Sequence, residues 1–511
     1  MAALRTLELP WRDPTAVACF LAARLGSQGL VLLEGDGSPL GQRAVLGVDP
    51  LETVCCRGLP GDPGATDPFA ALAALVERGG PWLGWLAYEA GAWVEPSAPW
   101  HRSDMATLWA VRHDPLLHFD LGGRRCWLEG RDPARLRAMA ALLAALPPAA
   151  ADPASEALAA ADTPAPAAKR AVVAAAQLDS PSGMAGIALG AGTDAAAAPR
   201  LQAAVGSAAT RPRTMPPGQP ETPTEPNALA APPIPLSAWR WHTTPQRYGD
   251  QVERLLRRIA AGDLFQANLT ACCEVELAVA PDPLALWQRL RHACPAPFAG
   301  VAIAAGGEAV ISASPERFLR LHRDGGVETR PIKGTRPRSA DPDRDARSAA
   351  ALVCDPKDRA ENVMIVDLLR NDLGRVCQPG SIQVPQLVAL ESYAQVHHLT
   401  SVVRGQLQPG RDLVALLRAC WPGGSISGAP KVRACSRLHA LEPVPRGPYC
   451  GSLFHLQADG GFDSSIVIRS VMQRGRRLRV HAGGGIVADS DPAAEAEEMG
   501  WKIRPLLEAL A

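Results

Sequence analysis

A long stretch without aromatic residues divides this chain of 511 residues. No Phe, Trp or Tyr occurs between Trp127 and Trp239, and residues 147–236 consist mainly of Ala, Pro, Gly, Ser and Thr. Such a segment cannot bury enough apolar surface to offset the conformational entropy that folding costs. We therefore predict a disordered linker over residues 147–236, between an N-terminal region of residues 1–146 and a C-terminal region of residues 237–511.

Charge and cysteine usage exclude several classes of function. The 52 basic and 52 acidic residues cancel, which removes the electrostatic case for nucleic acid binding. The twelve cysteines include no C-x-x-C pair, as is typical of reduced thiols in a cytoplasmic protein. Residues 1–13 carry four charged side chains and no apolar core, so we expect no secretory signal. No run of eighteen apolar residues exists, so we expect no membrane span.

The C-terminal region mixes helical and strand patterns without strict alternation between them, which favours an α+β fold. Apolar residues from Val252 to Ile259 recur at helical spacing, and Gly262 follows where a glycine commonly ends a helix. Over residues 265–277 apolar and polar residues alternate strictly, beginning with Phe265. This period of two predicts a strand with one apolar and one polar face, so that Gln266 points toward a cavity or solvent.

A lysine between proline and glycine is the first candidate for chemistry. Residues 331–335 read Pro-Ile-Lys-Gly-Thr, which predicts a tight turn that holds Lys333 on short backbone after an extended segment at residues 326–330. Taken alone, a lysine in a turn is most simply a solvated surface residue. The motifs around it give it meaning: Ser-Pro-Glu ending at Glu316, and glycine-rich segments at residues 422–431 and 482–486.

Two predicted helices begin alike and carry acidic residues. Asp355 and Asp491 each precede a proline, so each supplies an N-cap carboxylate before a proline at the first helical position. Asp358 and Glu361 are three apart and share one face of the first helix, whereas Glu495, Glu498 and Lys502 share one face of the second. The helix macrodipole alone explains acidic residues in a first turn. A carboxylate further along each helix would suit Mg²⁺, which accepts oxygen ligands and keeps waters.

The glycine-rich segments and one arginine bear on ligand binding. Residues 423–431 lack the Gly-Lys-Ser/Thr ending of a phosphate loop, and Pro430 has no N–H to offer, so nucleotide binding is not expected. Residues 483–485 are three glycines, which predict either a plain turn or backbone N–H groups approaching a carboxylate closely. Arg469 ends an apolar run, and a buried arginine pairs with a carboxylate of protein or ligand. His398 is either a core histidine or a substrate contact.

In their order and spacing these motifs resemble the chorismate-utilising enzymes, densely over residues 237–511 and thinly over residues 1–146. The resemblance implies an α+β fold of the anthranilate synthase and aminodeoxychorismate synthase type, with two packed β-sheets flanked by helices and interrupted here by the linker. The lysine of Pro-Ile-Lys-Gly-Thr resembles the aminodeoxychorismate synthase branch, because anthranilate synthases usually carry alanine there. Relatives that hydroxylate chorismate carry a lysine base at the position of Gln266, and glutamine cannot deprotonate water.

The resemblance also assigns roles to residues. Catalytic roles fall to Lys333 as a nucleophile, Glu316 as a general acid and Gln266. Magnesium ligands match Glu361 and Glu498, with Asp358 and Glu495 as supporting positions. The residues that match substrate contacts are Ser425, Tyr449, Arg469, Gly483, Gly485, Lys502, His398 and Thr335.

The implied reaction converts chorismate and ammonia to 4-amino-4-deoxychorismate through a lysine adduct, on the way to p-aminobenzoate and folate. No cysteine lies in the Gly-x-Cys-x-Gly setting of an amidotransferase nucleophile, so a separate glutamine amidotransferase subunit is expected to supply the ammonia. Two alternatives remain open: anthranilate synthase component I, which places nitrogen at C2 and releases pyruvate, and a catalytically silent homologue that binds chorismate or tryptophan. A catalytically silent protein would not need these acids and this lysine. The presence of Glu316, Lys333, Glu361 and Glu498 therefore argues against the silent alternative.

Overall fold

Antiparallel strands from distant parts of the chain form a large sheet in the computed structural model, which describes residues 3–146 and 232–511. Its order is β1-β8-β7-β3-β2-β11-β12-β21-β22-β10-β18, and β9 pairs with β10. The bounds are β1 (Arg5–Leu9), β2 (Val31–Glu34), β3 (Arg43–Gly47), β7 (Leu116–Asp120), β8 (Arg125–Gly130), β9 (Arg240–Trp241), β10 (Gln266–Glu276), β11 (Phe298–Ile303), β12 (Glu308–Ser314), β18 (Gly428–Ala429), β21 (Ser470–Arg474) and β22 (Arg477–Ile486).

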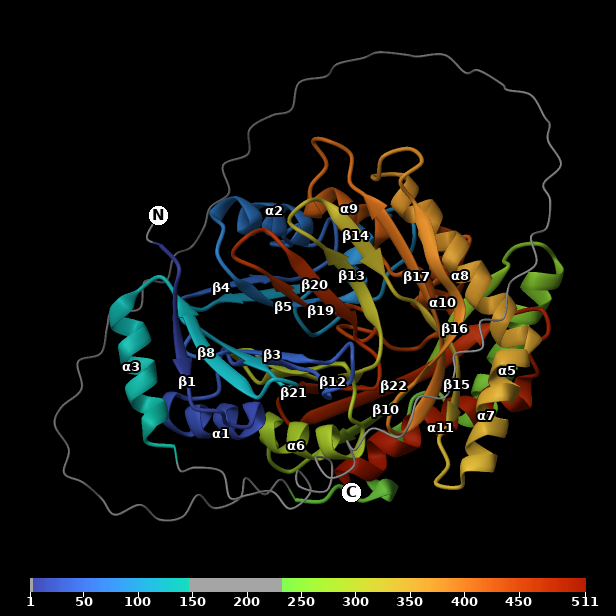
Figure 1. Cartoon of the computed structure of the whole chain (residues 1–511). Helices are drawn as coiled ribbons and strands as arrows, with labels where there is room; N and C mark the ends of the chain where they lie inside the picture. Colours follow the sequence, from blue (N-terminus) through green and yellow to red (C-terminus); the bar gives the residue numbers. More distant parts are fainter. Residues whose placement is uncertain (1–2, 147–231) are drawn as a thin grey trace. The chain divides into compact units, whose positions relative to one another are not determined.

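A second sheet is also antiparallel and runs in the order β15-β17-β14-β13-β20-β19-β5-β6-β4, with β16 beside β17. Its bounds are β4 (Glu52–Cys56), β5 (Trp82–Leu86), β6 (Leu108–Arg112), β13 (Arg317–Leu321), β14 (Gly326–Thr329), β15 (Ile332–Pro337), β16 (Gln383–Ser392), β17 (Val396–Gln406), β19 (Ser452–Leu456) and β20 (Phe462–Ile466). These sheets, with the helices beside them, confirm the predicted α+β class (Figure 1).

Both sheets take strands from both sides of the predicted linker. In the larger sheet β2 pairs with β11, and Leu32 lies opposite Val301. In the smaller sheet β5 pairs with β19, and Trp85 lies opposite Leu453. The described residues therefore form one body in which neither region has a sheet of its own.

The predicted linker lies outside the described residues as far as residue 231. Its last five positions are described, and there Ile234 is 1% exposed. The N–H of Ile234 donates to the carbonyl of Leu510 at 2.9 Å. Ile234 therefore packs on the core near the C-terminal end of the predicted linker, and the linker's bounds stay a prediction.

Most of the helices begin with an Asp-Pro or Thr-Pro pair, in which the Asp or Thr caps the helix and the proline occupies its first position. In α8, for example, the Asp355 carboxylate accepts from the Asp358 N–H, and in α11 Asp491 caps two N–H groups. The helices are α1 (Pro14–Leu25), α2 (Pro68–Arg78), α3 (Pro133–Ala144), α5 (Pro245–Ala260), α6 (Pro283–Ala293), α7 (Pro342–Cys354), α8 (Pro356–Gly374), α9 (Leu413–Cys420), α10 (Lys431–Leu441) and α11 (Pro492–Leu510). Short 3₁₀ turns are η1 (Tyr88–Trp93), η2 (Leu236–Ala238) and η3 (Gly424–Ile426). No helix of the described residues is long and apolar enough to cross a membrane.

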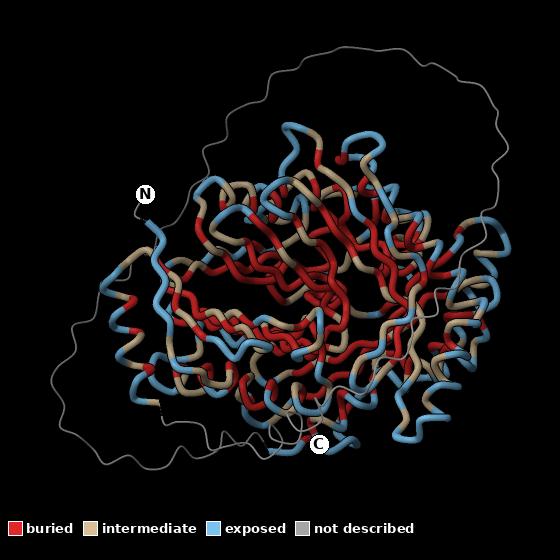
Figure 2. The backbone as a smooth tube through the Cα atoms, in the orientation of Figure 1, coloured by how far each residue is buried: buried red, intermediate tan, exposed pale blue. Residues whose placement is uncertain are grey.

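Strand alternation divides the core into two layers. On β11 and β12, Val301 and Ile311 face one hydrophobic cluster, whereas Ala302 and Val310 face another. The first cluster packs the larger sheet against α1, α5, α6 and α11, and the second joins the larger sheet to the smaller one and to α2, α8 and α9. Figure 1 shows these helices on the outer sides of the two sheets, and Figure 2 shows that the strands between them are buried.

Three predictions about local structure are wrong in part. The strand β10 is confirmed, but both of its faces are buried, because Glu274 on the polar face pairs with Arg479 of β22 at 2.7 Å. Phe265, expected to face the apolar layer, precedes the strand and is 69% exposed. Residues 331–335, predicted as a tight turn, lie mostly within β15. Residues 483–485, for which a turn was one of two alternatives, lie wholly within β22.

Candidate active site

The candidate site lies where an edge of the smaller sheet meets the larger one. Strand β15 brings Lys333 against helix α8, and β22, which lies between β21 and β10 in the larger sheet, packs against helix α11. A bulge in the pairing of β15 with β17 falls between Ile332 and Thr335, and Gly334 has a φ of 84°. A Cβ on Gly334 would lie 2.9 Å from the carboxyl carbon of Asp358, so glycine also allows α8 to approach. The bulge therefore aims Lys333 away from the regular strand pattern.

The side chain of Lys333 is held inside the protein. It is 11% exposed, and its Nζ donates to the carbonyl oxygen of Ser425 at 3.3 Å. The same nitrogen lies 4.0 Å from Oε2 of Glu361 on α8. A lysine in this setting is a reactive-group candidate and not the solvated surface residue that a turn would give.

Three of the predicted residues converge on the position where Gly485 has no side chain. A Cβ there would lie 2.4 Å from Nε2 of Gln266, 3.1 Å from Oε2 of Glu361 and 3.3 Å from Nζ of Lys333. We call Gln266, Lys333, Glu361 and Gly485 the lysine cluster. The β10–β22 pairing, in which Asn268 lies opposite Gly485, brings these distant parts of the sequence together.

Gln266 carries an indication that the lysine cluster binds a ligand. Its side chain is fully buried, and neither its amide nitrogen nor its amide oxygen has a hydrogen-bond partner among the described residues. A buried polar group without a partner is destabilising by about 1–3 kcal/mol. A bound molecule with a donor and an acceptor near Gly485 would satisfy both atoms.

Glu316 lies between β12 and β13 and is 5% exposed. Burial raises its pKa to about 7, and a hydrogen bond from Ser425, the charge of Lys333 and a hydrogen bond from the Ile332 backbone oppose that rise. The carboxyl group is therefore present in both protonation states near neutrality, as a general acid requires. Ser425, on η3, contacts Glu316 with its hydroxyl and Lys333 with its carbonyl.

The predicted metal-binding carboxyl groups come from α8 and α11. Burial raises the pKa of Glu361, Lys333 and Lys357 lower it, and Glu495 and Asp358 raise it further. The pKa of Glu498 is lowered, chiefly by the Lys502 ammonium 2.7 Å away.

The two supporting carboxyl groups have partners of their own. Oε1 of Glu495 accepts from Nζ of Lys357 at 2.6 Å and from the hydroxyl of Ser490 at 2.7 Å. Asp358 lies 3.2 Å from a guanidinium nitrogen of Arg336, and burial raises its pKa. The charges of both residues raise the pKa of Glu361, and their supporting role stays a prediction.

These carboxyl groups offer the oxygen atoms that Mg²⁺ accepts as ligands. A Cβ on Gly484 would lie 3.1 Å from Glu495 and 3.9 Å from Glu498, and one on Gly485 would approach Glu361, so two adjacent glycines open the space that the acids face. Among the described residues no group of three or more His, Cys, Asp and Glu is arranged to hold a metal. A magnesium ion at this position would be coordinated by few protein oxygens. Water and substrate oxygens would complete its coordination shell, as is common for Mg²⁺.

Arg469, His398 and Thr335 form a second set. The Thr335 hydroxyl lies 2.8 Å from Nδ1 of His398, and burial lowers the pKa of His398 to about 3, helped by the charge of Arg469. The imidazole is therefore neutral. Arg469 has a left-handed φ of 51°, burial lowers its pKa, and no carboxylate of the described residues forms an ion pair with it. A guanidinium in this state suits an anionic ligand.

Two other predicted substrate contacts have partners within the protein. The Tyr449 ring stacks on that of His481 with centroids 4.9 Å apart. Lys502 donates to the Gly483 carbonyl at 2.9 Å and pairs with Glu498, so it reaches β22 from α11.

Sequence reasoning missed Arg446. This buried guanidinium pairs with Glu442 at 2.6 Å and donates to the carbonyls of Ile426 and Asn268, both at 2.7 Å. It thereby ties the Ser425 turn to β10. The neighbouring Gly447 N–H donates to the Glu89 carboxylate of the N-terminal region at 3.0 Å. The available signal was an arginine enclosed by prolines and glycine just before Tyr449.

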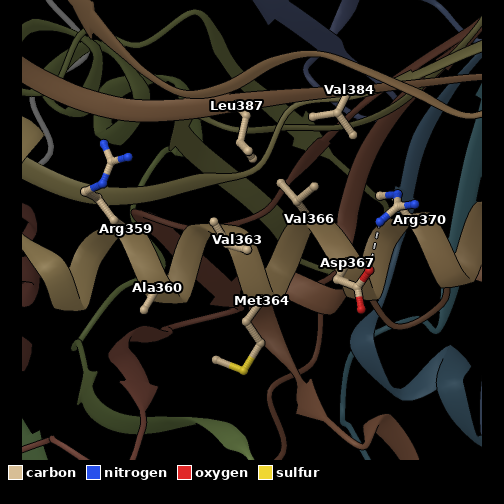
Figure 3. Close-up of a pocket in the computed structure, with 9 residues that line it drawn as sticks. All are labelled: Arg359, Ala360, Val363, Met364, Val366, Asp367, Arg370, Val384 and Leu387. Carbon is tan, nitrogen blue, oxygen red and sulfur yellow. Dashed lines mark hydrogen bonds and ion pairs between the residues drawn. The ribbon is translucent and has the colours of Figure 1, made fainter. Parts of the chain in front are cut away.

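A cavity of about 640 Å³ lies elsewhere, on the outer face of α8 beside β16 (Figure 3). Val363 lines it, two positions along the helix from Glu361, which belongs to the lysine cluster. The same helix thus borders two separate features.

Comparison with known proteins defines the class of protein. The sequence profile of the chorismate binding enzymes matches residues 192–508, which is more than half of the chain. The protein belongs to this family.

Individual relatives within this family carry two different names. Aminodeoxychorismate synthase component 1 of Klebsiella aerogenes is 45% identical over 274 residues, which are 54% of this chain and 60% of the relative. Anthranilate synthase component 1 of Streptomyces coelicolor is 43% identical over 272 residues, 53% of each chain. The matched part spans about 60% or less of the length of these relatives.

Solved structures confirm the predicted fold type. Anthranilate synthase component I from Streptococcus pneumoniae superposes with a TM-score of 0.63 at 23% identity, covering 91% of this chain and 92% of that one. The menaquinone-specific isochorismate synthase of Escherichia coli gives a TM-score of 0.65 at 16% identity, covering 99% and 95%.

Proposed function

We propose that this protein is an aminodeoxychorismate synthase component 1, which converts chorismate and ammonia to 4-amino-4-deoxychorismate. The convergence of Lys333, Gln266 and Glu361 at Gly485 carries the proposal, because it sets a primary amine against a buried, unpaired amide and an acid. The similarity to the Klebsiella aerogenes enzyme, in a family of chorismate binding enzymes, supports it.

Lys333 would act as the nucleophile. Its neutral amine attacks C2 of chorismate while the C4 hydroxyl leaves as water with a proton from Glu316. Ammonia then attacks C4, the bond between Lys333 and C2 breaks, and the electron pair returns to the amine. The amine has replaced the hydroxyl at C4 and pyruvate is retained.

The other residues would hold the substrate and protect the reaction. Arg469, unpaired by any described carboxylate, is suited to a carboxylate of chorismate, and neutral His398 with Thr335 borders it. Glu361 and Glu498 would hold a magnesium ion, which when bound stabilises negative charge on the ring carboxylate. Gln266 would donate to and accept from substrate without removing a proton from water, which favours ammonia over water as the incoming group.

The ammonia donor would be a separate glutamine amidotransferase subunit in the cytoplasm. The relatives named component 1 imply a second component, and this sequence has no amidotransferase nucleophile motif. The product would serve p-aminobenzoate and folate synthesis.

One assay tests the proposal. The purified chain is supplied with chorismate, Mg²⁺ and an ammonium salt, and the products are identified by mass. We expect 4-amino-4-deoxychorismate with no release of pyruvate. Anthranilate together with pyruvate would reject the proposal.

The second candidate function is anthranilate synthase component I, favoured by the 43% identity to the Streptomyces coelicolor enzyme. A lysine at C2 would block direct attack by ammonia there, so the position of Lys333 weighs against it. Lys333→Ala should open C2 and shift the residual product toward C2 amination. Lys333→Arg should form neither product, because a guanidinium is never appreciably neutral. Near-parental production by Lys333→Arg would reduce the lysine to a positioning charge.

A further inference from the structure

Arg446 is a buried charged residue to which the proposed reaction gives no part. Its side chain is 1% exposed, and its guanidinium donates hydrogen bonds to three different segments. Nε and Nη2 donate to the two carboxylate oxygens of Glu442 at 2.9 Å and 2.6 Å. Nη1 donates to the carbonyl of Ile426 and Nη2 to that of Asn268, both at 2.7 Å. Because the N–H groups of a guanidinium lie in one rigid plane, these bonds fix the segments relative to one another.

One of the two carbonyls belongs to the short turn η3. Ile426 directly follows Ser425. The Ser425 hydroxyl contacts Glu316, and the Ser425 carbonyl accepts from Nζ of Lys333 at 3.3 Å. The bond from Arg446 therefore holds the peptide next to the residue that contacts both the proposed acid and the proposed nucleophile. A displacement of η3 would change both contacts together.

The other carbonyl belongs to strand β10. Asn268 lies two positions beyond Gln266 and directly opposite Gly485 in the pairing of β10 with β22. Arg446 thus links η3 to the strand that brings the unpartnered amide of Gln266 into the lysine cluster. Since one guanidinium spans both segments, it fixes the position of Ser425 relative to Gln266.

The N-terminal region packs on the same guanidinium. Cζ of Arg446 lies 4.4 Å from the centroid of the Tyr88 ring. The Tyr88 N–H donates to the Gly447 carbonyl at 2.8 Å, and the Gly447 N–H donates to the Glu89 carboxylate at 3.0 Å. An arginine stacked on an aromatic ring is restrained in orientation as well as in distance. The N-terminal region thereby contributes to the geometry of a site whose predicted catalytic groups come from residues 237–511.

Stability alone does not account for this arrangement. Taking a guanidinium and a carboxylate out of water costs free energy, and apolar residues of similar volume often stabilise a core as well or better. The pair of Arg446 and Glu442 provides a fixed geometry instead, because a carboxylate and two backbone carbonyls accept from one planar group.

We propose that Arg446 is a positioning residue that holds Ser425 and Gln266 in the arrangement that the reaction requires. It acts through the backbone of η3 and β10 and not on the reacting atoms. This inference rests on the proposed function, in which Glu316 and Lys333 act on one substrate. Loosening η3 should weaken the hydrogen bond from Ser425 to Glu316. Because that bond lowers the pKa of Glu316, its loss should raise this pKa.

Arg446→Lys tests the proposal, with Arg479→Lys as the matched control. A lysine keeps a positive charge beside Glu442, but its single ammonium group cannot reproduce the planar set of bonds to both carbonyls. Arg479 is also largely buried, pairs with Glu274 at 2.7 Å, and lies on β22 six positions before Gly485. The turnover number kcat, KM and the pH dependence of kcat are measured with chorismate and ammonium, and circular dichroism reports folding.

The expected results separate positioning from support of the fold. Arg446→Lys should lower kcat about 100-fold, as small misplacements at a reacting centre do, and should change KM by less than about threefold. Its loss of kcat at high pH should shift to higher pH than in the parent. Arg479→Lys should keep the parental pH profile and a kcat within about threefold of the parent. An unshifted profile in folded Arg446→Lys would show that Arg446 does not act through Ser425 and would overturn the proposal.

A milder pair of variants decides the matter if Arg446→Lys does not fold. Tyr88→Leu removes the ring on which the guanidinium packs, and Tyr88→Phe keeps it as the control. Tyr88→Leu should lower kcat about threefold and shift the pH profile in the same direction, because the stacking that restrains Arg446 is lost. Kinetics equal to those of Tyr88→Phe would reject the positioning role.

The parent enzyme distinguishes this proposal from the proposed function. If the parent forms anthranilate and pyruvate, the proposed function is rejected, while the same comparison of kcat and pH profile for that product still decides the role of Arg446. A parent that forms no product from chorismate and ammonium would reject both.

Discussion

Helices α8 and α11 begin with similar sequences, but the pKa of the acid that each carries is shifted in opposite directions. Each has 19 residues, begins after a capping aspartate with proline at its first position, and brings an acid to the site. Glu361 on α8 is 8% exposed, and burial raises its pKa. Glu498 on α11 has a side chain that is 46% exposed, and Lys502 lowers its pKa. The local helix signal thus fixes where each acid lies, whereas the surroundings decide its charge.

This difference separates two roles for the carboxyl groups. Glu498 is ready as a carboxylate before any ligand arrives, because an ammonium group one helical turn away stabilises it. Glu361 is held in a drier setting, where burial raises its pKa and the charges of Lys333 and Lys357 oppose that rise. A change on α8 should therefore disturb the chemistry more than the matching change on α11.

The largest expected effect comes from removing these acids. Glu361→Ala and Glu498→Ala should each lower turnover by more than about 100-fold, since even partners behind metal ligands are worth 10–100-fold. Glu361→Ala should be the more severe because it also unpairs Lys333. Turnover and Mg²⁺ affinity are measured together, with the exposed Glu497→Ala as the control. Unchanged turnover in either variant at limiting Mg²⁺ would reject the metal assignment.

A methyl group added at each of two adjacent glycines compares the α8 side of the site with the α11 side. Gly485 adjoins Glu361 of α8, and Gly484 adjoins Glu495 and Glu498 of α11. Gly485→Ala would place a carbon 2.4 Å from Gln266 and should lower kcat roughly 100-fold, because small misplacements at a reacting centre cost that much. Gly484→Ala would meet Glu495 at 3.1 Å and should lose clearly less. Steady-state kinetics of the two variants, with circular dichroism as a folding control, decide the order. Equal losses would contradict the assignment of the lysine cluster.

Glu316 is buried like Glu361, and its raised pKa predicts how activity and stability depend on pH. With a pKa of about 7 and a role as acid, it should make kcat fall about tenfold per pH unit above neutrality. Its raised pKa adds stability that is fully present below the ordinary value of 4.5 and is lost as pH rises through about 7. Glu316→Gln should therefore gain stability relative to the parent across this window. Urea unfolding of both proteins between about pH 5 and pH 8 checks the sign. A constant difference in unfolding free energy would show that Glu316 does not titrate there.

The smallest expected effect concerns Lys502. Its pair with Glu498 is partly exposed, so Lys502→Ala should change the free energy of unfolding by less than about 1 kcal/mol. The lowered pKa of Glu498 stabilises the fold above 4.5, and this contribution is lost as pH falls through the lowered value. The variant should lack most of this acid dependence. A parental acid profile in Lys502→Ala would mean that another group stabilises Glu498.

The sequence predicted these helices well because capping and spacing are local. Asp355 and Asp491 mark their starts, and the spacing of the acids gives their faces. The α+β class followed from pattern, and the type of fold from resemblance. The assembly of the lysine cluster was not predictable from the residues alone, since the register that sets Gly485 beside β10 joins strands far apart in the chain.

Local patterns were misleading where tertiary contacts override them. A turn was one of two alternatives for residues 483–485, yet they lie in β22, where the Leu269 carbonyl would be 1.9 Å from a Cβ on Gly483 and so leaves room only for glycine. Lys333 was placed in a turn, and a bulged strand holds it.

The sharing of both sheets by distant strands has a consequence for synthesis on the ribosome. Glu89, just beyond β5, accepts a hydrogen bond from Gly447, which is synthesised 358 residues later. At roughly 5–20 residues per second, that interval lasts roughly 20–70 s. During this time β5, with Trp82 and Trp85, has no β19 to pair with. We therefore expect the nascent N-terminal region to depend on chaperones, and nonsense fragments that end before residue 447 to be degraded or to aggregate.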